Sequence, residues 1–156
     1  MNTLRDFLTV QSRRFARDTF LKFGEKQYSY IELDDRTDHV ATGLNRMGLR
    51  PADRVVLLLS NRPEFVFFLL GAPKLGFIPV PLNPEESFDT LASVMHHCTA
   101  AAVVTEKRFS GLRPRIPKET CWIEVDDDAF GKPPFQNLSS GPVLSFWPDL
   151  SAGEPA

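Results

Sequence analysis

Hydrophobic and polar residues recur along the first part of the chain with the spacing of helices and strands in turn. Residues 3–15 place apolar side chains three or four positions apart, which predicts a helix that Thr3 can cap. Residues 19–24 and 26–28 predict a short β-hairpin that turns around Gly24. We therefore expect a helix and a hairpin before the main body of the fold.

A longer helix is predicted directly after the hairpin. Ser29 and Glu32 have the spacing of a capping box, in which the serine oxygen accepts a backbone hydrogen bond and the glutamate reaches back, and Gly48 suits the end of the helix. The inward face carries apolar and small residues, namely Tyr30, Leu33, Thr37, Val40, Ala41, Leu44 and Met47. The outer face, which we expect to be a solvated surface, carries charged residues, namely Asp34, Asp35, Arg36 and Asp38.

From residue 54 onward, strand-like and helix-like segments alternate with short links. The apolar run over residues 54–59 is typical of a parallel strand that is covered on both faces. Pro79 and Pro81 shorten the second strand because proline donates no ladder hydrogen bond. The expected order is strand 54–59, helix 62–75, strand 77–82, helix 88–95, strand 101–105, short helix 106–112 and strand 121–125. Right-handed crossovers then predict an α/β fold, with an open, mostly parallel sheet and helices on both faces, beside the small N-terminal hairpin.

The pattern changes after Val125. Three aspartates follow at 126–128, and seven of the thirteen prolines lie from Pro114 onward. Few periodic segments remain there, so we expect an irregular C-terminal tail. The predicted division is an α/β subdomain over residues 1–128 and an extended or poorly ordered tail over 129–156.

Composition narrows the function classes. Hydrophobic residues make up 42% of the 156 residues and charged residues 24%, which excludes wholesale disorder. The 18 basic and 20 acidic residues give a net charge of -2, so we expect no nucleic-acid partner and no general attraction to anionic membranes. The longest strongly apolar run, 65–70, is too short to cross a bilayer, and the start does not have the pattern of a signal peptide. The expected location is the cytoplasm.

Motifs for metal binding or catalysis are not spelled out. His96, His97 and Cys98 are adjacent, but no second, spaced pair of ligands accompanies them, so structural or surface roles are favoured and no metal site is predicted. Cys121 and His39 stand apart from this group. The chain contains no G-x-x-x-x-G-K phosphate loop and no G-x-S-x-G elbow, and no catalytic residue is predicted.

The segment Asn61-Arg62-Pro63-Glu64-Phe65 is the strongest candidate for a binding edge. It begins a helix at the carboxyl end of a predicted parallel strand, where open α/β sheets usually bind ligands, and a helix amino end can hold an anion. Asn61 suits the cap, Pro63 is tolerated in the first turn, and Glu64 occupies a capping position that argues against direct anion binding. We therefore take Asn61, Pro63, Glu64 and Phe65 as substrate-edge candidates, with a structural helix cap as the alternative.

Several segments, taken in order, carry a family resemblance over roughly residues 3–125. They are 28–33 (YSYIEL), 43–55 (GLNRMGLRPADRV), 61–65 (NRPEF), 74–76 (KLG), 80–83 (VPLN) and 101–105 (AAVVT). In this order the chain resembles the amino-terminal region of the AMP-forming acyl-CoA synthetases, an adenylate-forming superfamily, and most of all the carnitine- and fatty-acid-CoA ligases.

The resemblance implies a carboxylic acid–CoA ligase that uses ATP, magnesium and coenzyme A, and forms an acyl-adenylate and then an acyl-CoA. The phosphate loop ending in Pro-Lys-Gly, the acidic ribose-binding motif, the hinge and the C-terminal catalytic lysine of that family do not occur in these residues. Residues 149–156 resemble the lead-in to that loop.

We therefore expect an N-terminal fragment that is inactive alone and needs no cofactor of its own. Its partner would be the remainder of the synthetase chain, or a second copy through an exposed apolar face. Two alternatives are a stand-alone, non-catalytic module that regulates a full-length synthetase, and an unrelated flavodoxin-like binding domain.

Overall fold

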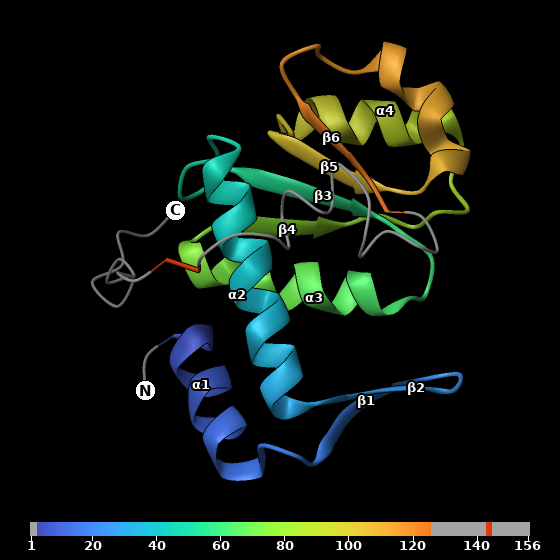
Figure 1. Cartoon of the computed structure of the whole chain (residues 1–156). Coiled ribbons are helices and arrows are strands. Elements are labelled where there is room, and N and C mark those ends of the chain that lie inside the picture. The colour runs from blue at the N-terminus through green and yellow to red at the C-terminus, as the bar shows by residue number, and fades with distance from the viewer. Residues whose placement is uncertain (1–2, 126–142, 145–156) are drawn as a thin grey trace.

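A four-stranded parallel sheet lies at the centre of the chain (Figure 1). The computed structural model describes residues 3–125 and 143–144. The strands are β3 (Arg54–Leu58), β4 (Ile78–Pro81), β5 (Ala102–Thr105) and β6 (Cys121–Glu124), in the order β4-β3-β5-β6. All three strand pairs are parallel, which confirms the predicted fold class.

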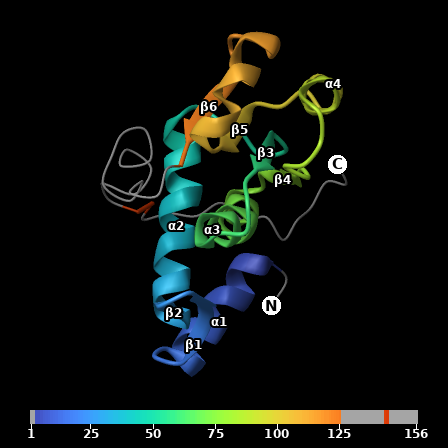
Figure 2. The ribbon, with the colours of Figure 1, turned by 90° about the vertical axis from the view of Figure 1, so that its right-hand side faces the viewer.

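Helices cover both faces of this sheet, as Figures 1 and 2 show. On one face lie α2 (Tyr30–Arg46) and α3 (Pro63–Gly71), and on the other α4 (Phe88–His97) and the 3₁₀ segment η2 (Lys107–Arg115). Alternate strand residues divide between the two cores, with Val55, Leu57 and Val104 on the α2 side and Val56, Leu58 and Val103 on the α4 side. Because the inner strands are buried on both faces, they are apolar at every position except Arg54 at the start of β3 and Thr105 at the end of β5.

The N-terminal layer consists of α1 (Leu4–Phe15) and an antiparallel hairpin of β1 (Thr19–Phe23) and β2 (Lys26–Ser29). The predicted capping box is confirmed, because the backbone N–H of Ser29 donates to Glu32 Oε2 at 2.8 Å while Ser29 Oγ accepts from the backbone N–H of Glu32. That backbone hydrogen bond from Ser29 lowers the pKa of Glu32.

The helix predicted over 62–75 is two segments. α3 ends at Gly71 and continues as a 3₁₀ turn, η1 (Ala72–Leu75), before Gly76 takes a left-handed φ of 77°. Gly71 is required by the closeness of α2, since a Cβ there would lie 2.8 Å from the carbonyl oxygen of Thr37. Among the described helices, none is long and apolar enough to cross a membrane.

One expectation about α2 is wrong. Asp34 and Asp38 do not lie on a freely solvated surface, because each carboxylate contacts the ammonium of Lys74 at 2.6 Å. The Lys74 side chain is fully buried, whereas those of Asp34 and Asp38 are 18% and 28% exposed. Ser12 of α1 also donates to Asp34 Oδ2, at 2.9 Å. Burial raises the pKa of Asp38, although the hydrogen bond from Lys74 acts in the opposite direction.

The predicted tail over 129–156 lies outside the described residues, apart from 143 and 144. At that point the backbone N–H of Leu144 donates to Thr42 Oγ1 of α2 at 3.4 Å, and Leu144 packs against the α2-side core.

We predict that the double substitution Asp34→Asn and Asp38→Asn lowers the free energy of unfolding by about 3–5 kcal/mol, because it leaves a buried ammonium without a counter-charge. Lys74→Met should cost less, since both carboxylates then reach water. Urea unfolding at neutral pH measures both effects.

Asp35→Asn is the matched control for this prediction. The Asp35 side chain is 67% exposed on the same helix, and its loss should change stability by less than about 0.5 kcal/mol. Equal stability of the double variant and the control would contradict the structural role of this cluster.

Candidate functional site

The carboxyl ends of β3, β5 and β6 lie at one end of the sheet. Ser60 and Asn61 lie shortly after β3, Glu106 directly after β5, and Val125 directly after β6. This is the end where open α/β sheets usually bind ligands, because the loops there are brought together by parallel strands.

Glu106 joins two of these strand ends. Its Oε1 accepts hydrogen bonds from the backbone N–H of Ser60 at 2.5 Å and from Ser60 Oγ at 2.6 Å, and its Oε2 accepts from Arg108 Nε at 2.9 Å. Burial by itself raises the pKa of Glu106, but the hydrogen bonds from Ser60 and Arg108 outweigh it, so the pKa lies below its usual value. The sequence prediction missed Glu106, although a carboxylate directly after a buried strand is the signal that would have found it.

Arg62 joins the third strand end and corrects the predicted helix cap. The N-cap of α3 is Arg62 rather than Asn61, and no side chain caps the helix. Arg62 Nε contacts Glu64 Oε2 at 2.8 Å, and Arg62 Nη1 donates to the carbonyl oxygen of Val125 at 3.0 Å. Glu64 is therefore the partner of a nearly buried guanidinium and not a capping carboxylate.

The four substrate-edge candidates occupy different environments. Asn61 is exposed, Pro63 and Glu64 are buried in the first turn of α3, and Phe65 packs against the α2-side core. The structure brings them together along one turn, but of the four only Asn61 is freely exposed to solvent.

Aromatic residues join α3 to the hairpin of β1 and β2. Tyr28 of β2 packs edge-to-face on Phe67 of α3, with ring centroids 5.2 Å apart, and the Arg36 guanidinium lies 5.6 Å from both rings. Burial raises the pKa of the Tyr28 hydroxyl, opposed by Arg36 and reinforced by Glu64. These contacts between Tyr28, Phe67 and Arg36 fix the position of α3 against the hairpin. They do not place a nucleophilic side chain beside a basic one.

Two side chains of the His96-His97-Cys98 group contact backbone carbonyl oxygens. His96 Nε2 lies 2.9 Å from the carbonyl oxygen of Arg115, and Cys98 Sγ lies 3.6 Å from that of Met95. Within residues 3–125 and 143–144, no group of three or more His, Cys, Asp and Glu side chains is placed to hold a metal ion.

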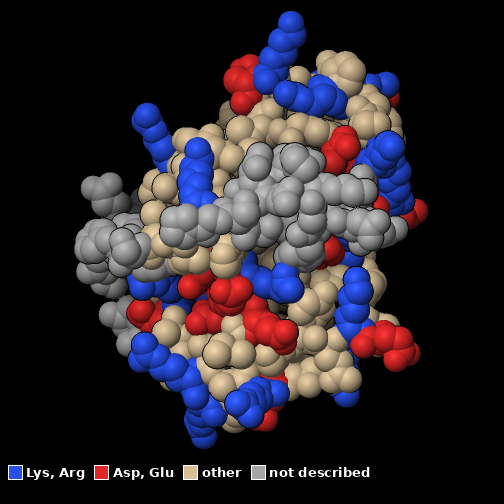
Figure 3. All heavy atoms as spheres, viewed as in Figure 1, with Lys and Arg blue, Asp and Glu red and all other residues tan. Residues whose placement is uncertain are grey.

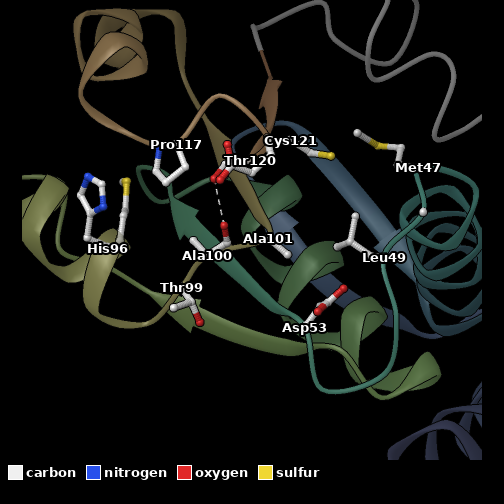
Figure 4. A pocket seen from close by; sticks show the side chains of 13 residues that line it. Met47, Leu49, Asp53, His96, Thr99, Ala100, Ala101, Pro117, Thr120 and Cys121 are labelled. Carbon is white, nitrogen blue, oxygen red and sulfur yellow. Dashed lines mark hydrogen bonds between the residues drawn. The ribbon is translucent and has the colours of Figure 1, made fainter.

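A cavity of about 490 Å³ opens at the opposite end of the sheet, beside the amino ends of β3, β5 and β6 (Figure 4). Met47, Leu49, His96 and Cys121 line it. The hydroxyl of Thr120 donates a hydrogen bond to the backbone carbonyl oxygen of Ala100 at 3.0 Å. Because the cavity lies at the amino ends of the strands, it is at the end of the sheet that parallel α/β folds do not usually use for ligands.

The fold and the braced carboxyl end define an open α/β scaffold, and comparison with known proteins identifies its class. The sequence model of the family described as "AMP-binding enzyme" matches residues 8–144. The chain belongs to this family. The match rules out the alternative of an unrelated flavodoxin-like domain.

The curated relatives include CoA ligases. The chain is 36% identical over 87 residues to a crotonobetaine/carnitine–CoA ligase of Proteus mirabilis, covering 56% of this chain and 17% of that protein. It is 32% identical over 121 residues to the long-chain fatty acid transport protein 6 of Mus musculus, covering 74% of this chain and 20% of that protein. The chain thus spans about a fifth of the length of these relatives.

Solved structures share the fold. A benzoate CoA ligase from Burkholderia xenovorans superimposes with a TM-score of 0.81 at 19% identity, covering 94% of this chain and 30% of that one. The N-terminal domain of FACL13 from Mycobacterium tuberculosis gives a TM-score of 0.79 at 21% identity, covering 95% and 38%.

We predict that Glu106→Ala lowers the free energy of unfolding by about 1–3 kcal/mol, because the backbone N–H of Ser60 loses its acceptor. Since the pKa of Glu106 is lowered by folding, its contribution is present above its ordinary value of 4.5 and is lost as the pH falls through the folded pKa. The stability of Glu106→Gln should therefore fall less on acidification than that of the wild type.

Urea unfolding over a series of pH values measures both effects. Glu119→Gln, at an exposed carboxylate, is the control and should keep the wild-type profile. Identical acid profiles for wild type and Glu106→Gln would argue against the bond between the strand ends.

Proposed function

We propose that this chain is the N-terminal scaffold of an ATP-dependent carboxylic acid–CoA ligase and that it is catalytically incompetent alone. One observation carries the proposal: the AMP-binding family matches residues 8–144, while the chain spans only 17–20% of the relatives above. In the whole ligase, ATP, magnesium and coenzyme A would serve acyl-adenylate and then acyl-CoA formation.

Two cations that could meet a magnesium–ATP complex are engaged within the chain, which supports the proposed incompetence. Lys74 is fully buried between two carboxylates, so its ammonium is not available to a phosphate. Arg62, at the amino end of α3, is paired with Glu64. Adenylation depends on stabilising charge on the triphosphate and on positioning the carboxylate. The groups that stabilise the triphosphate and position the carboxylate would have to come from other parts of the ligase.

The carboxyl end of the sheet would act as a brace in this account. Glu106 and Arg62 hold the ends of three strands at fixed spacing. Catalytic loops supplied by the rest of the ligase would then meet a rigid edge, with Asn61, Pro63, Glu64 and Phe65 along its first helical turn. A rigid edge matters because small displacements of reacting groups cost large factors in rate.

The partner in this proposal is the remainder of a ligase chain. Four exposed, large hydrophobic residues lie on the N-terminal layer, namely Phe7, Val10, Phe20 and Phe23, and Ile31 lies nearby in the first turn of α2. Such residues are expected at a surface that another part of the protein covers, and without that cover they would promote self-association. On the face shown in Figure 3, basic and acidic side chains are interspersed. A cytoplasmic location, where ATP and coenzyme A are available, belongs to the same proposal.

We predict that the isolated chain catalyses no ATP–pyrophosphate exchange above a no-protein control with carnitine, crotonobetaine, benzoate or long-chain fatty acids. The physical reason is that the cations at the carboxyl end of the sheet are already paired, Arg62 with Glu64 and Arg108 with Glu106, and that Lys74 is buried between two carboxylates. A full-length CoA ligase assayed in parallel shows that the conditions support exchange. Substrate-dependent exchange by the isolated chain, saturating in ATP, would refute its proposed incompetence.

A further inference from the structure

The two outer edges of the sheet, β4 and β6, differ in their ability to bind another strand. An outer strand presents backbone N–H and C=O groups that a further strand can pair with, unless the edge is blocked. Along any strand, successive residues direct these groups to opposite sides. The hydrogen bonds that each outer strand makes to its neighbour therefore fix which of its residues face outward.

The β4 edge is closed by proline. Ile78 and Leu82 direct their N–H groups inward, to the carbonyl oxygens of Asp53 at 2.8 Å and Leu57 at 3.0 Å. The outward positions within the strand are therefore 79 and 81, and both are proline. Since proline has no N–H, the outer edge of β4 offers no donor to a further strand.

The β6 edge has no such block. The N–H groups of Cys121 and Val125 point inward, to the carbonyl oxygens of Ala101 at 2.9 Å and Thr105 at 2.7 Å. Trp122 and Glu124 therefore direct their N–H and C=O groups outward. In the part of the chain that the structure describes, no strand follows β6 in the sheet.

The outward pair is also self-complementary. Trp122 Nε1 donates to Glu124 Oε1 at 2.9 Å, and Trp122 packs on the α4 side of the sheet. If two β6 strands meet antiparallel about a two-fold axis beside Ile123, Trp122 of each copy lies opposite the partner's Glu124. Each backbone pair then exchanges two hydrogen bonds, and each indole lies beside a second carboxylate.

We propose that β6 pairs antiparallel with β6 of a second copy of this chain, which joins two four-stranded sheets into one continuous sheet. The contact is isologous, so it uses the β6 edges of both copies. The β4 edges at the far ends are blocked by proline, so no further copy can add. This proposal rests on the sheet alone and stands or falls independently of the proposed ligase function.

Sedimentation velocity and light scattering of the 156-residue chain across a wide concentration range test the proposal. The expected mass rises from 17.6 kDa to twice that value and no further. Glu124→Pro removes an outward N–H and leaves the inward ladder intact, as Pro79 and Pro81 do on β4, so it should weaken dimerisation by roughly tenfold or more.

Two further variants complete the test. Glu124→Thr, which keeps the N–H, is the matched control and should remain a dimer. Restoring donors to β4 with Pro79→Val and Pro81→Thr should open a second edge and produce assemblies larger than a dimer. Thermal melts establish that each variant is folded.

Hydrogen exchange gives a readout that does not depend on any variant. In the dimer, the amides of Trp122 and Glu124 should gain protection as concentration rises. A chain that stays monomeric at every concentration would overturn the proposal, and so would protection of these amides in a monomer. Dimerisation that survives Glu124→Pro but is lost on replacing Phe20 and Phe23 would also overturn it, because it would place the contact on the N-terminal layer.

Discussion

The ammonium group of Lys74 lies inside the protein, and its need for counter-charges constrains three separate segments. An uncompensated buried charge costs several kcal/mol, so η1 can take its position only if α2 presents Asp34 and Asp38 to it. Asp34 in turn accepts a hydrogen bond from Ser12, which ties α1 to the same cluster. Gly71 lets α2 approach close enough for these contacts to form. The cluster therefore sets how the helical layer lies on the sheet.

A second set of contacts lies at the carboxyl end of the sheet. There α3 begins shortly after β3, Arg62 reaches the end of β6, and Glu106 reaches Ser60. The charged groups at this edge are used for pairing with each other and with the backbone. These contacts fit the proposed role as a scaffold, because the carboxylates and guanidinium groups that join the strand ends are engaged within the chain.

Most of the fold could be predicted from the sequence because its signals are local. The helical spacing near the N-terminus, the capping box at Ser29 and Glu32, and the apolar runs of the parallel strands are all set by neighbouring residues. The contacts that escaped prediction join residues far apart: Lys74 and Asp34 are separated by 40 positions, and Glu106 and Ser60 by 46. No periodic pattern encodes such pairs.

The error at the start of α3 has a different cause. Asn61 is the better intrinsic cap, but Arg62 takes the cap position because its guanidinium is held by Glu64 and the Val125 carbonyl. Tertiary contacts therefore outweighed a local preference worth about 1 kcal/mol.

The central claim is that these residues form the scaffold while the groups that handle the triphosphate lie outside them. Titration of the isotopically labelled chain with magnesium–ATP, followed through the backbone amide signals of Ser60, Asn61 and Glu106, tests it most directly. The account predicts no saturable shift of these signals. A saturable shift centred on these residues would contradict it, because it would place a nucleotide site within the chain itself.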